Sequence, residues 1–249
     1  MGENMGGINA IIFDIDDTLF DQLEWLEGAF SKVSELIEDR FGASKKIVEK
    51  KLRRLTIERG SASGNLFNLA LEELGIQETP ALIKEAIAAF YSHHPKKLTP
   101  YPGVKKTLSK LKARGFKLGV ISEGREKVQI QKLKALGIHH FFDAVLIVKL
   151  HRGEPRRTSS YTKILKVLKS GPNECIYVGD NPYKDFVNAK KIGIHTVRVF
   201  TGEYRKKKVD KNLDADFSVN NIREILEVIE KLQRLPTMGR LKLQHRCHF

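Results

Sequence analysis

The chain has 249 residues, of which 41% are hydrophobic and 30% are charged, so it has the length and composition of a globular protein with a sizeable core. It contains none of the runs of roughly 18 apolar residues that cross a membrane, so we expect no membrane segment. Two cysteines and an N-terminus without a signal-peptide pattern argue against a disulfide framework. We therefore expect a cytoplasmic protein.

The net charge of +14 is concentrated in the middle of the chain. Residues 1–95 carry 10 Lys and Arg against 16 Asp and Glu, a net −6, whereas residues 96–169 carry 19 against 4, a net +15. A solvated, lysine-rich surface is the simplest explanation, and steering of an anionic substrate is a second. Nucleic-acid binding is the third and least favoured.

In chain order, the sequence predicts one strand, then a block of helices, then alternating helices and strands. The strand NAIIFD is followed by apolar residues at helical spacing up to residue 98, including a helix start at Thr79-Pro80. After Tyr101 the predicted strands are 117–122, 143–148, 174–179, 195–200 and 215–219, and the predicted helices begin at Gly103, Arg125, Thr158, Tyr183 and Ile222.

Strands that alternate with helices of this length form a parallel sheet with right-handed crossovers. We predict an α/β fold in which a Rossmann-like parallel-sheet core carries an all-helical cap inserted after the first strand. We assign residues 1–19 and 99–235 to the core, residues 20–98 to the cap, and residues 236–249 to a basic tail that we expect to be disordered.

Two carboxylates follow the first predicted strand, in FDIDDTLF. Because side chains alternate along a strand, Asp14 and Asp16 are expected on the same side. Ligands of an open parallel sheet bind beyond the carboxyl ends of its strands, where this pair lies. Such a pair can raise one pKa to make an acid, or it can hold a divalent cation.

A second acidic cluster follows the strand CIYVG, in GDNPYKD. It supplies Asp180 and Asp185, again at the carboxyl end of a strand. Oxygen donors without His or Cys suit a hard cation, and Mg²⁺ is the usual choice where a phosphate completes its coordination. We therefore predict a metal site formed by Asp14, Asp16, Asp180 and Asp185.

These motifs resemble those of the haloacid dehalogenase superfamily. FDIDDTLF is similar to its first motif, VISEG to its second and VGDNPYKD to its fourth, and the helical insert matches its helical cap. The resemblance implies that Asp14 is a nucleophile that forms an aspartyl-phosphate. It also implies that Asp16 protonates the leaving oxygen and then activates water, and that Mg²⁺ is held by Asp14, the Asp16 carbonyl and Asp180, with Asp185 in support.

The resemblance of VISEG to the second motif also implies a phosphate-binding site. Ser122 is expected to bond a phosphoryl oxygen through its hydroxyl, with help from the amides of Glu123 and Gly124. Dehalogenases of the same superfamily work without metal and need no second acid in the first motif, so the four aspartates favour phosphoryl transfer. A phosphomutase shares all of these groups and stays open.

The third motif of the superfamily should supply a lysine, usually followed by proline, but this sequence has Glu154-Pro155. A charged Glu154 facing a phosphoryl group would be repelled by about 4 kcal/mol at 4 Å in a medium of effective dielectric near 20. Three hypotheses are open. An arginine of the segment acts instead (Arg152, Arg156 or Arg157, with Arg152 and Arg156 our predicted phosphate ligands), Lys149 does so from the strand end, or the enzyme is impaired.

The leading expectation is a Mg²⁺-dependent phosphatase that acts on a small phosphorylated metabolite, as a monomer or a homodimer. The rival is a binding module for nucleic acid or protein on a degenerate enzyme fold, motivated by Glu154 and by the basic middle of the chain. A phosphomutase activity and a dehalogenase activity rank below these two.

Overall fold

The computed structural model describes residues 7–61, 63–149 and 155–234. Within these residues the chain divides into two compact units. One unit is formed by the chain up to Asp21 together with the chain from Thr99 onward, and we call it the core unit. The other spans Gln22–Leu98, and we call it the helical unit.

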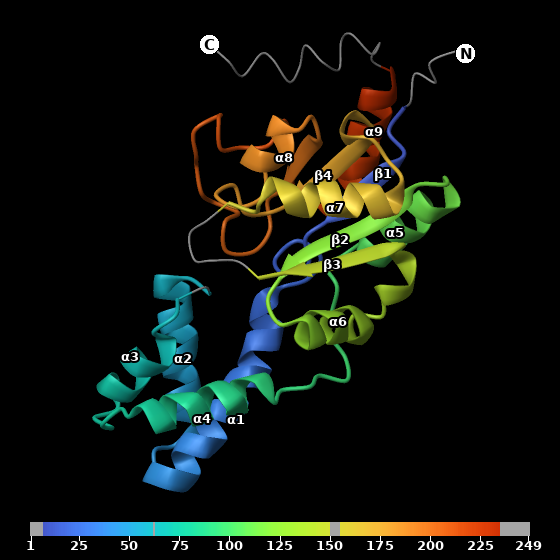
Figure 1. The fold of residues 1–249 in the computed structure, drawn as a ribbon. Coiled ribbons are helices and arrows are strands. Elements are labelled where there is room, and N and C mark those ends of the chain that lie inside the picture. Colours follow the sequence, from blue (N-terminus) through green and yellow to red (C-terminus); the bar gives the residue numbers. More distant parts are fainter. Residues whose placement is uncertain (1–6, 62, 150–154, 235–249) are drawn as a thin grey trace. The chain divides into compact units, whose positions relative to one another are not determined.

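The core unit is built on a parallel sheet in the order β3-β2-β1-β4-β5-β6, in which every neighbouring pair of strands is parallel (Figure 1). All six predicted strands are present, which confirms the α/β, Rossmann-like prediction. Their bounds are β1 Ala10–Phe13, β2 Lys117–Glu123, β3 Ala144–Val148, β4 Cys175–Gly179, β5 His195–Val199 and β6 Phe217–Val219.

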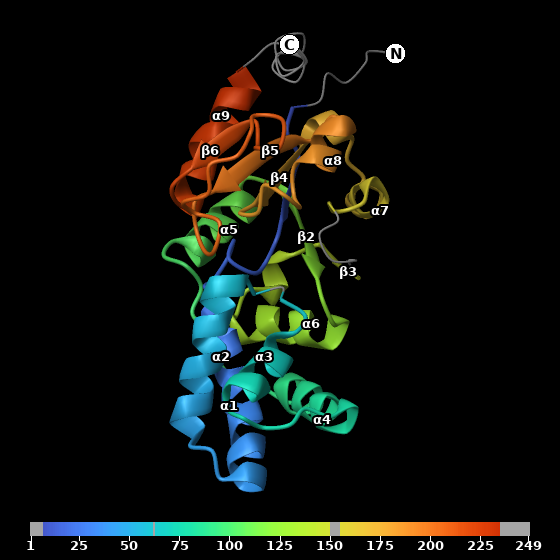
Figure 2. The ribbon, with the colours of Figure 1, turned by 90° about the vertical axis from the view of Figure 1, so that its left-hand side faces the viewer.

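Helices cover both faces of this sheet. Figure 2 shows α7 (Thr158–Leu168) and α8 (Val187–Lys191) on one side, with α5 (Val104–Ala113) and α9 (Ile225–Arg234) on the other. The helix α6 (Glu126–Ala135) links β2 to β3. Short 3₁₀ turns complete the unit: η1 His139–Phe141, η2 Pro172–Glu174 and η3 Ile222–Glu224.

The middle of the sheet is a topological switch point, because the strand order runs outward in opposite directions from the pair β1 and β4. Phe13 of β1 is aligned with Val178 of β4 and with Val120 of β2. All residues of β1 and β4 are buried, as expected of central strands covered on both faces. The residues that follow β1 and β4 therefore meet where open α/β sheets bind their ligands.

The helical unit contains α1 (Gln22–Phe41), α2 (Lys45–Arg59), α3 (Leu66–Glu73) and α4 (Pro80–Tyr91). The predicted start of α4 is confirmed, because the Thr79 hydroxyl accepts a hydrogen bond from the Leu82 amide at 3.1 Å. Trp25, Phe30 and Phe67 each pack their ring against that of Phe90. Of these aromatic residues, Trp25 and Phe30 are buried, and Phe67 and Phe90 are half-buried.

One helix prediction is wrong at its boundary. The sequence predicts a helix from Tyr183, whereas α8 begins at Val187 and the preceding residues form turns. The Asp185 amide donates to the Asn181 carbonyl, which closes one tight turn after β4 instead of starting a helix. None of the helices in the described ranges combines the length and the apolar character that a membrane span requires.

Candidate active site

Asp14 is fixed by the sheet itself. Its amide donates to the Val178 carbonyl at 2.9 Å, which extends the β1–β4 ladder one residue beyond the strand. The side chain is only 1% exposed. The carboxylate therefore stands at the switch point, held by the backbone of two central strands.

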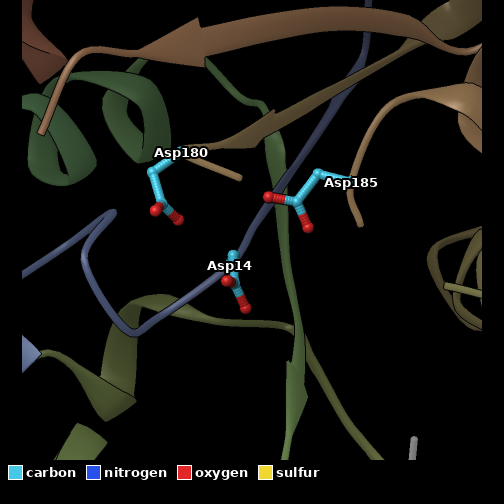
Figure 3. A group of neighbouring side chains, drawn as sticks. All are labelled: Asp14, Asp180 and Asp185. Carbon is cyan, nitrogen blue, oxygen red and sulfur yellow. The ribbon is translucent and has the colours of Figure 1, made fainter. Parts of the chain in front are cut away.

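Asp180 and Asp185 complete a carboxylate triad with Asp14 (Figure 3). All three are buried, and one oxygen of each lies within 4.8 Å of the others. Asp180 Oδ1 accepts the Thr18 hydroxyl at 3.1 Å, which ties the loop after β1 to the end of β4. The triad thus joins residues that are far apart in the sequence.

The loop after β4 is shaped around Asp185. Its Oδ2 accepts the Asn181 amide at 3.0 Å and its Oδ1 accepts the Tyr177 hydroxyl at 3.2 Å. A Cβ on Gly179 would lie 2.3 Å from Asp185 Oδ2, so the close approach of this carboxylate to β4 requires glycine. This contact explains the glycine of the motif GDNPYKD.

Two cations flank Asp14. Arg156 Nη2 lies 3.3 Å from Asp14 Oδ1, and Lys184 Nζ lies 3.1 Å from Asp14 Oδ2. Glu123 contacts both cations, at 3.0 Å from Arg156 Nη2 and 3.4 Å from Lys184 Nζ. The two cations differ in access, since the Arg156 side chain is fully buried and that of Lys184 is 19% exposed.

These charges give the three carboxyl groups of the triad different pKa values. Burial alone would raise the pKa of Asp14, but the charges of Lys184 and Arg156 outweigh it and hold that pKa below its usual value. Burial and the charge of Asp185 raise the pKa of Asp180 well above its usual value, and burial raises the pKa of Asp185 to about 7.

The triad fits a divalent metal ion. It offers carboxylate oxygens without nitrogen or sulfur, which is the donor set that a hard cation takes in proteins. Asp180 and Asp185 have raised pKa values, so the local positive charge does not fully compensate them. A divalent ion held by Asp14, Asp180 and Asp185 would supply the missing charge.

Asp16 lies apart from the triad at the level of its side chain. Its Oδ1 is 2.6 Å from Lys132 Nζ and its Oδ2 accepts from Gln129 Nε2 at 2.8 Å, both on α6. The same Gln129 nitrogen lies 2.6 Å from the hydroxyl of Ser122, which is 1% exposed. The predicted role of the Asp16 carbonyl as a metal ligand stays a prediction.

The other predicted site residues fall into three groups. Arg156 is beside Asp14 and the Glu123 side chain faces the cations, while the Gly124 amide donates to the Val148 carbonyl at 3.2 Å and so extends the β2–β3 ladder. Lys149 and Arg157 are exposed. Arg152 and Glu154 lie outside the described residues, so those predictions stay open.

Sequence reasoning missed three polar side chains of this site: Lys184, Lys132 and Gln129. Lys184 precedes Asp185 within GDNPYKD, so its proximity to a predicted metal ligand was a usable signal. The sequence carried no such signal for Lys132 and Gln129, because polar side chains on an amphipathic helix are expected to face solvent.

The chain matches the family model "Haloacid dehalogenase-like hydrolase" over residues 11–199. It is 33% identical to a glyceraldehyde 3-phosphate phosphatase of Methanopyrus kandleri over 231 residues, covering 91% of this chain and 99% of that protein. A glyceraldehyde 3-phosphate phosphatase of Methanocaldococcus jannaschii is 32% identical over 229 residues, covering 91% and 99%.

Solved structures share the fold. The crystal structure of a predicted phosphoglycolate phosphatase from Haemophilus somnus superposes with a TM-score of 0.68 at 21% identity, covering 91% of this chain and 99% of that one. The family match spans most of the core, including the ends of β1 and β4 where the triad lies. The chain is therefore a member of the haloacid dehalogenase-like hydrolase family.

Proposed function

We propose that this protein is a Mg²⁺-dependent phosphatase that hydrolyses a small phosphomonoester through an aspartyl-phosphate on Asp14. The observation that carries the proposal is the surroundings of Asp14, a buried carboxylate that has a cation beside each of its oxygens. A carboxylate can attack a phosphoryl group only if the repulsion between the two anions is removed. Lys184 and Arg156 are arranged to do so.

In the first half of the reaction, an oxygen of Asp14 attacks phosphorus and the bond from phosphorus to the leaving oxygen breaks. The lowered pKa of Asp14 supports this role, because the carboxylate stays ionised and ready to attack. Asp16 gives a proton to the leaving oxygen. In the second half, Asp16 takes a proton from water, and the water attacks phosphorus to release phosphate and regenerate Asp14.

Lys184 is the better candidate for contact with the phosphoryl oxygens. Its side chain is 19% exposed, whereas Arg156 is fully buried against Asp14, Glu123 and Asp185. We propose that Lys184 takes the place of the lysine that the third motif lacks, and that Arg156 balances the carboxylates behind it. Two cations would then share the work of the single third-motif lysine: Lys184 would contact the phosphoryl group and Arg156 would neutralise the carboxylates.

The metal ion would be held by Asp14, Asp180 and Asp185, together with the Asp16 carbonyl. When bound, Mg²⁺ would supply charge neutralisation for the phosphoryl oxygens. Ser122, the amides of Glu123 and Gly124, and Arg152 remain proposed phosphate ligands, although the Gly124 amide would have to exchange its bond to the Val148 carbonyl for one to the phosphoryl group. We assign residues 1–19 and 99–235 to the catalytic core and residues 20–98 to a cap. We expect the protein to act in the cytoplasm as a monomer or a homodimer.

Glyceraldehyde 3-phosphate is the first substrate to test. The two relatives at 33% and 32% identity carry that substrate in their names and are matched over nearly their whole length. A triose phosphate is also small enough to fit the general expectation of a phosphorylated metabolite. The panel should contain other phosphomonoesters of similar size, because substrate choice can change within a family that keeps its chemistry.

The decisive experiment measures phosphate release from p-nitrophenyl phosphate and from the panel, with Mg²⁺ and with EDTA. We expect turnover that requires Mg²⁺ and that Asp14→Asn abolishes. Turnover that persists in EDTA or in Asp14→Asn would overturn the proposal. No turnover on any ester, combined with salt-dependent binding of DNA or RNA, would favour a binding module on a degenerate enzyme fold.

A further inference from the structure

A buried lysine on α6 faces the first catalytic motif. The side chain of Lys132 is only 4% exposed, which is a costly position for an ammonium group unless a partner compensates its charge. Its Nζ lies 2.6 Å from Asp16 Oδ1 and 5.8 Å from the centre of the Phe20 ring. The ion pair with Asp16 therefore compensates the charge of an ammonium group that would otherwise be expected to lie in solvent.

The other oxygen of Asp16 is held from the same helix. Gln129 lies three residues before Lys132, so both side chains project from one face of α6. Gln129 is 2% exposed, and its Nε2 donates to Asp16 Oδ2 at 2.8 Å. Each oxygen of the Asp16 carboxylate thus has its own anchor on α6.

Gln129 also connects Asp16 to the phosphate-binding motif. Its Nε2 lies 2.6 Å from Ser122 Oγ, and one amide group has two hydrogens, enough for one bond to each oxygen. When the Ser122 oxygen accepts from Gln129, the serine hydroxyl hydrogen is left to donate elsewhere. In this arrangement Ser122 can donate to a phosphoryl oxygen while the neighbouring Asp16 protonates the leaving oxygen.

We propose that Lys132 and Gln129 are positioning residues that hold the Asp16 side chain on the leaving-group side of the site and couple it to Ser122. The inference rests on the proposed phosphatase function, in which Asp16 is the acid and base. Asp16 keeps a 16% exposed side chain, so the anchors leave part of it accessible. Neither Lys132 nor Gln129 needs to contact the substrate.

The first test compares Lys132→Met with Lys134→Met, an exposed lysine on the same helix. With glycerol phosphate, an alkyl ester whose leaving oxygen needs a proton, kcat should fall at least about tenfold in Lys132→Met and stay unchanged in Lys134→Met. KM should change by less than about twofold, because binding is not the lost step. Release of p-nitrophenol in the first turnover, which needs little protonation, should fall much less.

A double-mutant cycle separates positioning from a structural role. If Lys132 acts through Asp16, Lys132→Met should cost nothing further in an Asp16→Asn background, and Lys132→Arg should recover part of the alkyl-ester rate. A loss of equal size on both esters that persists in Asp16→Asn would overturn the inference. So would Lys132→Met with wild-type kcat on glycerol phosphate.

Thermal melting of each variant checks that it is folded. If Lys132→Met does not fold, Gln129→Met carries the same test with the same expected pattern. An inactive wild-type protein would overturn the proposed function, and this inference with it. An active wild-type protein whose rate is indifferent to Lys132 and Gln129 would overturn the inference alone.

Discussion

Ion pairs between the same residue types lie at the surface of the helical unit and, at the candidate site, in the interior of the core unit. In the helical unit, Arg54 pairs with Glu58 and Glu73 while its side chain is 44% exposed. In the core unit, Arg156 pairs with Asp14, Glu123 and Asp185 while fully buried.

Exposed pairs add little to stability, because water and salt screen them and ordering two long side chains costs entropy. Buried pairs carry a desolvation cost that their attraction does not always repay, so they are weak evidence for stability. Their concentration around Asp14 and Asp16 is better explained by chemistry. The buried pairs of Arg156 and Lys132 therefore belong to the candidate site, whereas Arg198, which is equally buried in the core unit, pairs with Asp214 instead.

The largest effect is expected from Arg156→Leu. Removing the buried cation takes from Asp14 one of its two flanking cations and from Asp185 its ion pair with Arg156. Breaking a buried pair in this way lowers the free energy of unfolding by about 3–5 kcal/mol. Urea denaturation followed by circular dichroism measures the change. Arg157→Leu, at an exposed neighbouring position, is the control. Equal losses in the two variants would remove the distinction between buried and exposed charges.

Lys184→Met should mainly affect activity. Loss of one charged donor to a phosphoryl group costs about 10²-fold in kcat, equivalent to about 2.7 kcal/mol. Steady-state kinetics with p-nitrophenyl phosphate would measure it, with Lys191→Met on the exposed surface of α8 as the matched control. A Lys184→Met enzyme within about twofold of wild type would return the role to Arg156 or Arg152.

Gly179→Ala should have an intermediate effect on stability. The added Cβ would meet Asp185 Oδ2 at 2.3 Å, so the carboxylate or the strand must move, and overpacking of this kind costs about 1–3 kcal/mol. Calorimetry should detect the loss, and titration with Mg²⁺ should show weaker binding because Asp185 is displaced. Unchanged stability together with unchanged Mg²⁺ affinity would contradict the close packing described for this loop.

The smallest effect is expected from Glu73→Gln in the helical unit. Glu73 accepts from Lys51 and Arg54 at the surface, so its removal should leave the urea midpoint almost unchanged. Whatever difference exists at low salt should disappear at high salt. A loss comparable with that of Arg156→Leu would mean that exposed pairs contribute as much as buried ones here.

The sheet and the acids could be predicted from the sequence because both follow local rules. Parallel strands carry their carboxyl ends at the same edge of the sheet. Apolar runs followed by aspartates were therefore enough to predict that Asp14, Asp180 and Asp185 lie close together. The alternation of helices and strands identified all six strands of the sheet.

The cations were harder to predict because their contacts depend on long-range geometry. Arg156 was one of several candidates in a basic segment, and only the path of the chain into α7 selects it. The contact of Lys184 with Asp14 was not predicted because a helix was expected from Tyr183, whereas the chain makes turns there. Lys132 depends on the rotation of α6 about its axis, which residue spacing on a mixed helix does not determine.

In the proposed function, Asp14 is the nucleophile. The most direct test uses Asp16→Asn protein, in which attack can proceed with p-nitrophenyl phosphate but the water step loses its base, so the phosphoenzyme should accumulate. Acid quenching followed by borohydride converts an aspartyl-phosphate to homoserine, which peptide mass spectrometry locates. We expect homoserine at position 14 only when substrate and Mg²⁺ are present. Release of p-nitrophenol without any homoserine at position 14 would contradict it.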